Sequence, residues 1–456
     1  MADLAADLVR LTADLRADEL APATEETVRA DILDTIGCAI AGRGAAGVAE
    51  LAAVLGDWGG RPESGVWGSD ARLPAPMAAL VNGTAAHALD FDDTHDDAVL
   101  HAGVTVVPAA LAAAQRRGGV PWEELLCAVA AGLEVACRLG MATTAGPSES
   151  GWLLTPLCGT FGAATAAARL LGCDTDRTLH TLGIAYAQAA GNGQATLDGA
   201  LTKRMQAGFA ARDGVVAAVL AEAGITGAAA VLEGPRGYFR VYHGGRYDRA
   251  LALDGLGTRF VLDGLRFKPY PCCRWTHAAI DAALDCRRRR LAAGDVEAIE
   301  VEVSRQAQAS TGRQPSGEAG PAGVVSAQFS IPYAVAVALL EGPPGLEHFT
   351  AAAVRRPDLL ALARRVSVDP EPEERRGITP ATVHVRRRSG GSVTAHVDRP
   401  AAVGLDAVRR KFLSCCAFGG IRPAAADAFA DEVLHAPRPD VEAAAGALRP
   451  SPDPEP

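Results

Sequence analysis

Apolar residues recur three and four positions apart along most of the chain, which is the spacing of one face of an α-helix. Gly and Pro interrupt these stretches, for example at Gly118-Gly119, Pro121 and Gly224. The pattern predicts that the first part of the chain is helical, with helices over residues 2–16, 24–42, 46–56, 76–91, 105–117, 121–141, 159–171, 175–195 and 205–223.

The pattern changes after about residue 255. Val296 to Val303 alternate between apolar and polar side chains, as a half-buried strand does. Similar segments predict strands at 366–369, 382–385 and 392–397, among helices at 276–291, 325–341 and 357–365. A mixture of the two periods is typical of an α+β unit. Helical periodicity returns at 404–416 and 423–446.

These patterns together predict a mainly α protein with two domains. A large all-helical domain would combine residues 1–265 with 400–446, and a smaller α+β domain would comprise residues 266–399. Residues 447–456 alternate Pro with polar residues near the end, so we expect a disordered tail there.

Composition excludes several classes of protein. Of 456 residues 49% are hydrophobic, so the chain can form a core and is not intrinsically disordered. The net charge of −10 makes nucleic acid or an anionic membrane surface an unexpected partner. We see no apolar run of the ~20 residues that cross a bilayer. The N-terminus carries acidic residues where a signal peptide needs a basic segment, so we expect a cytoplasmic protein.

Cysteine and lysine usage narrows the chemistry. Ten cysteines without a Cys-x-x-Cys pair are too dilute for a disulfide framework or a zinc ribbon. Only three of the 44 basic residues are lysines, namely Lys203, Lys268 and Lys411. Arginine therefore fills the generic basic roles, and lysine is expected where a compact ammonium group is needed.

The most unusual segment runs from His87 to His101 and holds five aspartates and three histidines. A continuing helix would place Asp90 and Thr94 on one face. Three interpretations are open. Asp92-Asp93-Thr94-His95-Asp96 fits the Asp-Asp-x-x-Asp pattern by which helical terpenoid synthases hold Mg²⁺ and a diphosphate. The segment could also be a solvated acidic loop, or a proton-transfer site in which aspartates orient histidines.

The segment from Asn82 to Thr94 resembles the signature of the MmgE/PrpD family, whose members include 2-methylcitrate dehydratase, cis-aconitate decarboxylase and iminodisuccinate epimerase. Further stretches resemble the family in the same order along the chain. They are Leu33–Gly37, Cys158–Gly162, Leu201–Gly208, Gly224–Gly227, Leu232–Gly234, Lys268–Cys273 with His277, and Ala327–Tyr333.

The resemblance implies a large helical domain and a smaller α+β lid domain, with the active site between them. It also implies a homodimer that acts on a small carboxylate or carbonyl substrate and needs no metal or organic cofactor.

The resemblance also implies a set of site residues. The catalytic residues would be His101, Lys203, His277 and Tyr333. The spacing from Asp90 to His101 is one residue longer than in relatives, so His95 is a second candidate for the base. Substrate-binding residues would be Asp90, Thr94, Leu153, Lys268 and Arg204. Histidine suits proton transfer near neutrality, and lysine suits stabilisation of an enolate.

One position departs from the family pattern. Where relatives commonly read Gly-Trp-His-Pro-Thr, this chain reads Gly151-Trp152-Leu153, so a protonatable side chain is replaced by an aliphatic one. This puts 2-methylcitrate dehydration and cis-aconitate decarboxylation in doubt as literal activities.

We therefore predict a cofactor-independent lyase or isomerase that abstracts a proton next to a carboxylate or carbonyl group. One alternative is a family member recruited to a specialised natural-product pathway, for isomerisation or cyclisation of a less charged substrate. A Mg²⁺-dependent helical diphosphate enzyme and a non-catalytic dimer are two others.

Overall fold

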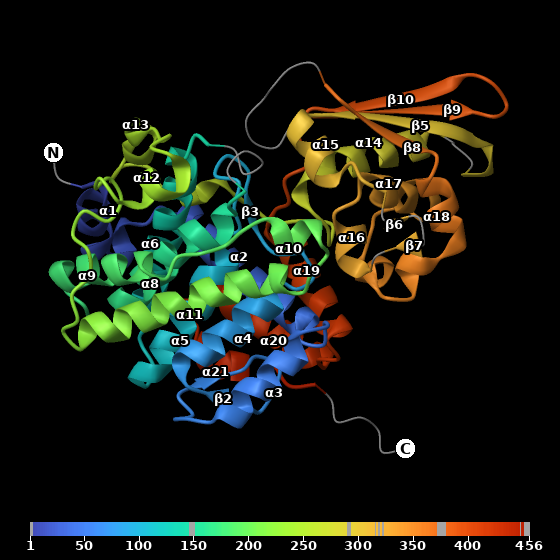
Figure 1. The fold of residues 1–456 in the computed structure, drawn as a ribbon. Helices are drawn as coiled ribbons and strands as arrows, with labels where there is room; N and C mark the ends of the chain where they lie inside the picture. The colour runs from blue at the N-terminus through green and yellow to red at the C-terminus, as the bar shows by residue number, and fades with distance from the viewer. Residues whose placement is uncertain are drawn as a thin grey trace. The chain divides into compact units, whose positions relative to one another are not determined.

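A computed structural model describes residues 3–145, 151–289, 293–314, 316–317, 320–321, 323–371, 380–446 and 448–450 (Figure 1). The chain divides into two compact units. The helical unit comprises Met1–Gln194, Leu201–Phe267 and Gly404–Pro456, and the mixed unit comprises Ala195–Ala200 with Lys268–Val403.

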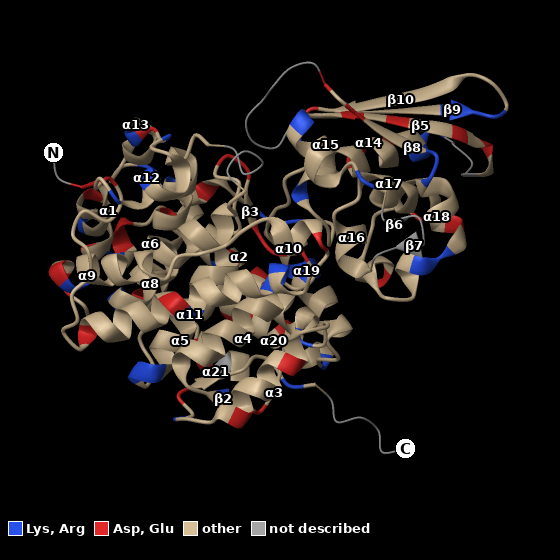
Figure 2. Ribbon diagram, viewed as in Figure 1, with Lys and Arg blue, Asp and Glu red and all other residues tan. Residues whose placement is uncertain are grey.

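The core of the helical unit is a group of closely packed helices. They are α2 (Pro22–Gly42), α4 (Ala75–His87), α5 (Gly103–Arg117), α6 (Trp122–Ala142), α8 (Leu154–Leu170) and α11 (Thr202–Glu222). Helix α4 carries no Lys, Arg, Asp or Glu, and α8 carries only Arg169 (Figure 2). A Cβ atom on Gly132 of α6 would lie 2.7 Å from the carbonyl oxygen of Gly162 in α8, so these two backbones can meet only because both residues are glycine.

Shorter elements surround this core. The helices are α1 (Leu4–Ala13), α3 (Val48–Trp58), α9 (Thr175–Tyr186), α12 (Tyr238–His243), α13 (Arg249–Leu253), α19 (Leu405–Phe418), α20 (Pro423–His435) and α21 (Val441–Gly446). Two antiparallel strand pairs join β1 (Ser64–Gly65) with β2 (Arg72–Leu73) and β3 (Thr94–His95) with β4 (Leu265–Arg266). Helix α10 (Gln194–Leu197) lies where the chain passes from one unit to the other.

The mixed unit is built on a four-stranded sheet of order β10-β9-β5-β8. Strand β5 (Val296–Val303) runs parallel to β8 (Val366–Pro370) and antiparallel to β9 (Ala381–Arg387), which pairs with β10 (Ser392–Val397). The apolar residues of β5 and β9 are buried against α14 (His277–Arg288) and α17 (Ile331–Leu340). The remaining elements are α15 (Arg305–Thr311), β6 (Ser316–Gly317), β7 (Gly320–Pro321), α16 (Val324–Gln328) and α18 (Pro357–Ala363).

The predicted fold class, mainly α with a smaller α+β part, is confirmed. Several predicted helices differ from those observed; the helix predicted over 175–195, for example, ends at Tyr186. The helix predicted over 76–91 ends at His87, and that over 325–341 is interrupted where Ser330 caps α17 by accepting the Tyr333 N–H. The helix over 423–446 is broken at 436–440, which contain two prolines.

Among the described residues, α6 is the one helix long and apolar enough to cross a membrane, and 94% of its most apolar stretch is buried in the helical unit. Core helices of globular domains share this composition, so α6 is weak evidence for a membrane span. The cytoplasmic location stays a prediction.

Most of the predicted tail, 447–456, lies outside the described residues. Only residues 448–450 are described, and there Leu448 is buried and Pro450 forms a bridge with Ile421.

Candidate active site

The connection between α4 and α5 carries the unusual segment of aspartates and histidines. Helix α4 ends at His87, and two residues that follow it, Asp90 and Val99, have left-handed backbones with φ of 52° and 55°. Such φ values are uncommon for residues with a side chain and are typical of functional loops. The turn at Asp90 ends the helix, so the expected pairing of Asp90 with Thr94 on one helical face is wrong.

Asp93 fixes the second half of this loop to the start of α5. Its carboxylate accepts the N–H groups of Ala102 at 3.0 Å and Gly103 at 3.1 Å. The side chain is fully buried, and burial raises the pKa of Asp93 to about 7. A carboxylate at a helix N-terminus satisfies N–H groups that have no partner within the helix. Asp93 therefore holds His101, the residue before Ala102, in a defined place.

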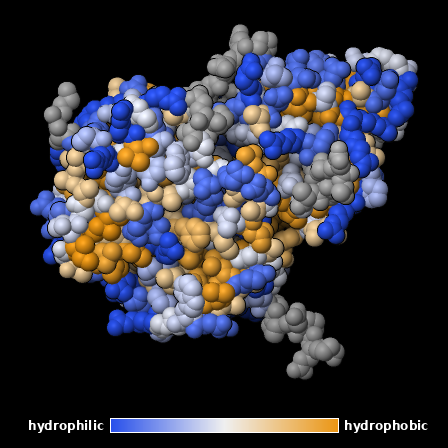
Figure 3. Space-filling model, in the orientation of Figure 1, coloured by the Kyte–Doolittle hydropathy of each residue, from blue (hydrophilic) through white to orange (hydrophobic). Residues whose placement is uncertain are grey.

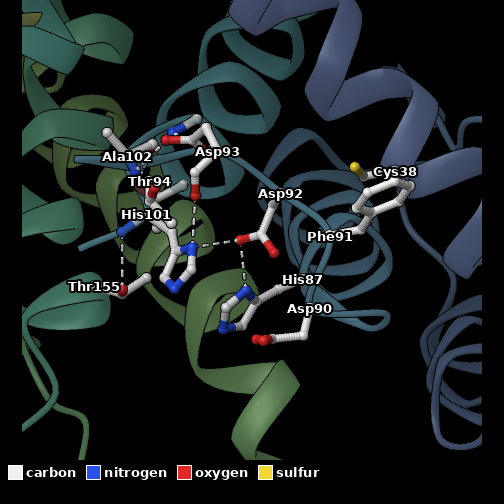
Figure 4. Close-up of polar contacts among 12 residues, drawn as sticks. Cys38, His87, Asp90, Phe91, Asp92, Asp93, Thr94, His101, Ala102 and Thr155 are labelled. Carbon is white, nitrogen blue, oxygen red and sulfur yellow. Dashed lines mark hydrogen bonds and ion pairs between the residues drawn. The ribbon is translucent and has the colours of Figure 1, made fainter. Parts of the chain in front are cut away.

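The surroundings of His101 determine which ring nitrogen can act as a base. His101 Nδ1 lies 2.6 Å from the carbonyl oxygen of Asp93 and 3.1 Å from Oδ2 of Asp92 (Figure 4). Both partners accept hydrogen bonds, so Nδ1 carries the proton of the neutral ring and Nε2 carries the lone pair. The His101 side chain is 20% exposed, whereas Asp92 is fully buried. The geometry therefore favours Nε2 as a general base.

His87 shares the same carboxylate. Its Nδ1 lies 2.7 Å from Asp92 Oδ2, and the rings of His87 and His101 are 5.0 Å apart. Burial lowers the pKa of His87 to about 4, so this ring is neutral and donates its proton to Asp92. Asp92 thus accepts from both rings, and its negative charge would stabilise a positive charge formed on His101.

The resemblance-based set of site residues did not include His87 and Asp92. The signal that could have found them was the density of histidine and aspartate in the segment, which already suggested aspartates orienting histidines.

Two predicted site residues, Asp90 and Lys203, form an ion pair. Lys203, in the first turn of α11, donates from Nζ to Asp90 Oδ1 at 2.7 Å, and both side chains are almost fully buried. The positive charge of Lys203 is one of the influences that lower the pKa of His87. Lys203, Asp90 and the His87–Asp92–His101 cluster therefore form one group within the helical unit.

The structure does not bring His95 into this group. Its Nε2 lies 2.9 Å from the carbonyl oxygen of Val261, and its Nδ1 accepts the N–H of Ala98 at 3.1 Å. Burial lowers the pKa of His95. Both nitrogens are occupied by backbone groups, so His95 anchors the loop and has no free lone pair for catalysis.

Arg204 and Thr94 also bind the protein itself. Arg204 donates to the carbonyl oxygen of Ala46 at 3.0 Å, and burial lowers its pKa. Thr94, in β3, donates from its hydroxyl to Asp96 at 3.2 Å. The charge of Asp90 partly offsets this lowering of the Arg204 pKa, so Arg204 lies near the Asp90–Lys203 pair.

Leu153 lies at the N-cap of α8, next to the part of that helix that contacts His101. The hydroxyl oxygen of Thr155, two residues further on, accepts the His101 N–H at 3.1 Å. Leu154 and Leu157 are buried, while Leu153 is partly exposed. The start of α8 therefore carries three leucines close to the residue that contacts His101.

Three further predicted residues lie in the mixed unit, and all three are buried. His277, at the start of α14, lies with Nε2 3.2 Å from the carbonyl oxygen of Cys272. Tyr333 donates its hydroxyl proton to the carbonyl oxygen of His348 at 2.7 Å, and burial raises its pKa. Lys268 is fully buried.

The third lysine, Lys411 of α19, connects helix α2 to the loop between α4 and α5. Its Nζ forms an ion pair with Asp34 of α2 at 2.7 Å and donates to the carbonyl oxygen of Phe91. It also lies 4.2 Å from the centre of the Phe91 ring. Burial opposes the charge of Lys411, but Asp34 outweighs burial and the pKa is raised. The scarcity of lysine signalled this residue, although its role required the structure.

Among the described residues, one group of side chains could hold a metal ion, namely His87, Asp92 and His101, whose ligand atoms lie within 4.8 Å of one another. It is not the Asp-Asp-x-x-Asp arrangement of a Mg²⁺–diphosphate site. Asp92 binds two histidines and Asp93 caps α5, so these two aspartates are engaged with the protein.

Comparison with known proteins agrees with the resemblance seen in the sequence. Residues 6–250 match the MmgE/PrpD N-terminal domain, and residues 270–436 match the MmgE/PrpD C-terminal domain. Cis-aconitate decarboxylase of Aspergillus terreus is 28% identical over 360 residues, which are 74% of this chain and 73% of that protein. The enzyme of Homo sapiens is 30% identical over 318 residues, which are 68% of this chain and 65% of that protein.

Proposed function

Because the chain belongs to the MmgE/PrpD family, we propose that it is a cofactor-independent lyase or isomerase that moves a proton at a carbon next to a carboxylate or carbonyl group. One observation carries this proposal. His101 Nδ1 lies against a buried carboxylate and a backbone carbonyl oxygen, both of which are acceptors, and this arrangement leaves the lone pair of the neutral ring on Nε2. A histidine oriented in this way is a typical general base.

The proposed chemistry follows from these contacts. Nε2 of His101 takes the proton from the substrate carbon, and the imidazolium that forms keeps its Nδ1–H toward Asp92. The electron pair left on the carbon is delocalised as an enolate, which the nearby charge of Lys203 stabilises. The pair then either takes a proton at another carbon or expels a leaving group. In a decarboxylation the order is reversed: His101 enters the cycle protonated on both ring nitrogens, CO₂ departs first, and the carbanion takes the proton from Nε2, which leaves the neutral ring.

A proton-exchange experiment tests this chemistry without knowledge of the natural substrate. Candidate carboxylates and 2-oxo acids are incubated with the protein in D₂O, and deuterium incorporation is followed by NMR. We expect exchange next to a carboxylate or carbonyl group with at least one candidate, because abstraction at His101 is reversible. If no member of a broad panel exchanges or is consumed, the proposal fails.

The aliphatic start of α8 favours a substrate with an apolar group at one end. A tricarboxylate near Leu153 would leave one carboxylate without the hydrogen bond that a histidine supplies, at a cost of about 1–3 kcal/mol. This supports the alternative that the chain serves a specialised pathway with a less charged substrate.

We therefore expect no useful turnover of cis-aconitate or 2-methylcitrate, although the relatives named above are cis-aconitate decarboxylases. The measurement is product formation by the purified protein, with Leu153→His as the comparison variant. Leu153→His should not improve turnover of the natural substrate. Ordinary enzyme rates on either acid with the unchanged protein would contradict this expectation.

We also propose that the protein is a homodimer. Apolar residues gather on the face of the helical unit over α11 and α4 (Figure 3). Helix α3 exposes two large apolar side chains, Val54 at 49% and Trp58 at 71%. Exposed apolar surface of this kind is typical of subunit interfaces. Light scattering at micromolar concentration should give twice the chain mass of 46.9 kDa, and Trp58→Glu should shift the result toward the monomer.

A further inference from the structure

We propose that His87, Asp92 and His101 form a binding site for Zn²⁺, and that the bound ion switches the base off. The second half of this proposal rests on the proposed function, because it takes His101 to be the base. The first half concerns binding alone and can be tested without any substrate.

The ligand set is suited to zinc. Two imidazole nitrogens and one carboxylate oxygen are a common set of three protein ligands, with a fourth position left for water. Zn²⁺ holds such atoms at about 2.0–2.1 Å, so neighbouring ligands around the ion are about 3.3 Å apart. Asp92 Oδ2 already lies 2.7 Å from His87 Nδ1 and 3.1 Å from His101 Nδ1. The ligand atoms of all three residues lie within 4.8 Å of one another, so one ion can lie between them after adjustment of the side chains.

The surrounding structure holds the ligands in place before an ion arrives. His87 closes the last turn of α4, and both His87 and Asp92 are buried. His101 is held through its backbone N–H to Thr155 and through the helix cap at Asp93. The site therefore has little ordering entropy to lose on binding. Mg²⁺ is a poor fit, because it prefers oxygen ligands and two of these three are imidazoles.

Zinc at this position would prevent His101 from acting as a base, because it would change which ring nitrogen carries the proton. A neutral imidazole has one proton and one lone pair, and in the free protein the proton is on Nδ1. When Nδ1 donates its lone pair to Zn²⁺, the Nδ1 proton leaves to solvent and Nε2 takes up a proton from solvent, so the ring keeps one proton overall. Nε2 then has no lone pair to accept a proton from a substrate. Asp92 also gives its charge to the ion, so it no longer stabilises an imidazolium.

Calorimetric titration of the EDTA-treated, dialysed protein tests the site. We expect one Zn²⁺ per chain, no comparable binding of Mg²⁺, and loss of affinity by about 10²-fold or more in Asp92→Asn and His101→Gln, since even outer partners of a metal site contribute 10- to 100-fold. Co²⁺ should give the visible absorption of a tetrahedral ion, and His101→Gln should change that spectrum. His101 is the preferred variant because its partial exposure makes misfolding less of a concern, and a thermal melt checks this.

A matched control removes exposed histidines elsewhere. His384 and His396 lie on β9 and β10 beside acidic residues and could bind zinc weakly. The double variant His384→Ala/His396→Ala should keep the stoichiometric ion. If this variant loses the ion, or if His101→Gln and Asp92→Asn bind Zn²⁺ as the unchanged protein does, the proposed site is wrong.

The activity arm tests the consequence of binding. EDTA-treated protein should be fully active, turnover should fall in parallel with Zn²⁺ occupancy, and EDTA should restore it. If Zn²⁺ binds at these residues and raises turnover, both the inhibitory role and the cofactor-independent mechanism are wrong. If Zn²⁺ binds there and no substrate of any class is turned over or exchanged, the metal site stands and the proposed function fails.

Discussion

His101→Gln lowers turnover by about 10²-fold or more, because a general base typically contributes 10²–10⁴-fold. Glutamine is close in size to histidine and can still donate a hydrogen bond toward Asp92, but it has no basic nitrogen. The fold should therefore be kept while proton abstraction is lost. The measurement is kcat on the natural substrate, or the rate of deuterium exchange where the substrate is not known.

His95→Gln is the matched control, since it alters a histidine six residues away in the same loop. A glutamine amide can still donate to the carbonyl oxygen of Val261, the group that His95 now contacts. The folded protein should keep most of its activity, with some loss of thermal stability. The opposite result, with His95→Gln inactive and His101→Gln active, would move the base to His95.

Gly103→Ala destabilises the protein and impairs the site, although alanine is normally the better residue in a helix. A Cβ atom at Gly103 would lie 2.6 Å from Asp31 Oδ1 and 2.6 Å from Thr35 Oγ1. Both side chains are fully buried on α2 and cannot move into solvent. Overpacking of this kind costs about 1–3 kcal/mol, and a shift of the start of α5 would also displace His101. Thermal unfolding and turnover should therefore both decline.

Gly56→Ala is the control for this second experiment. Gly56 lies within α3, and a Cβ atom there meets nothing within 4 Å. The substitution should stabilise the protein by up to about 1 kcal/mol, because alanine loses less backbone entropy in a helix. If Gly103→Ala melts at the same temperature as Gly56→Ala or higher, the contact with Asp31 and Thr35 does not constrain the helix.

The best-predicted elements were those in which the spacing of apolar residues shows which face of the element is buried. The alternation from Val296 to Val303 became β5, and the apolar spacing of residues 121–141 became α6. Helix ends were predicted less well. Helix α4 stops at His87 because Asp90 adopts a left-handed backbone, and nothing in the spacing of apolar residues reports that conformation.

The candidate site was also predicted in part. Residues that lie close together in the sequence could be recognised, whereas contacts between distant residues could not. The density of charged residues between His87 and His101 marked the loop in which the structure brings His87, Asp92 and His101 together. The resemblance supplied Lys203, which pairs with Asp90 from a helix more than a hundred residues away. The choice between His95 and His101 could not be made from the sequence. It depends on the carbonyl oxygen of Val261, which occupies His95 and is brought there by the tertiary fold.

The contact of Lys411 with Phe91 has a consequence for the order of events during synthesis of the chain. A ribosome exposes residues 88–102 early, but the ammonium group that holds this loop belongs to α19, which follows the whole of the mixed unit. A nascent chain that ends before Gly404 contains every residue of the proposed base cluster and lacks its anchor. We therefore expect the loop to gain this anchor only near the end of translation, after the mixed unit has emerged.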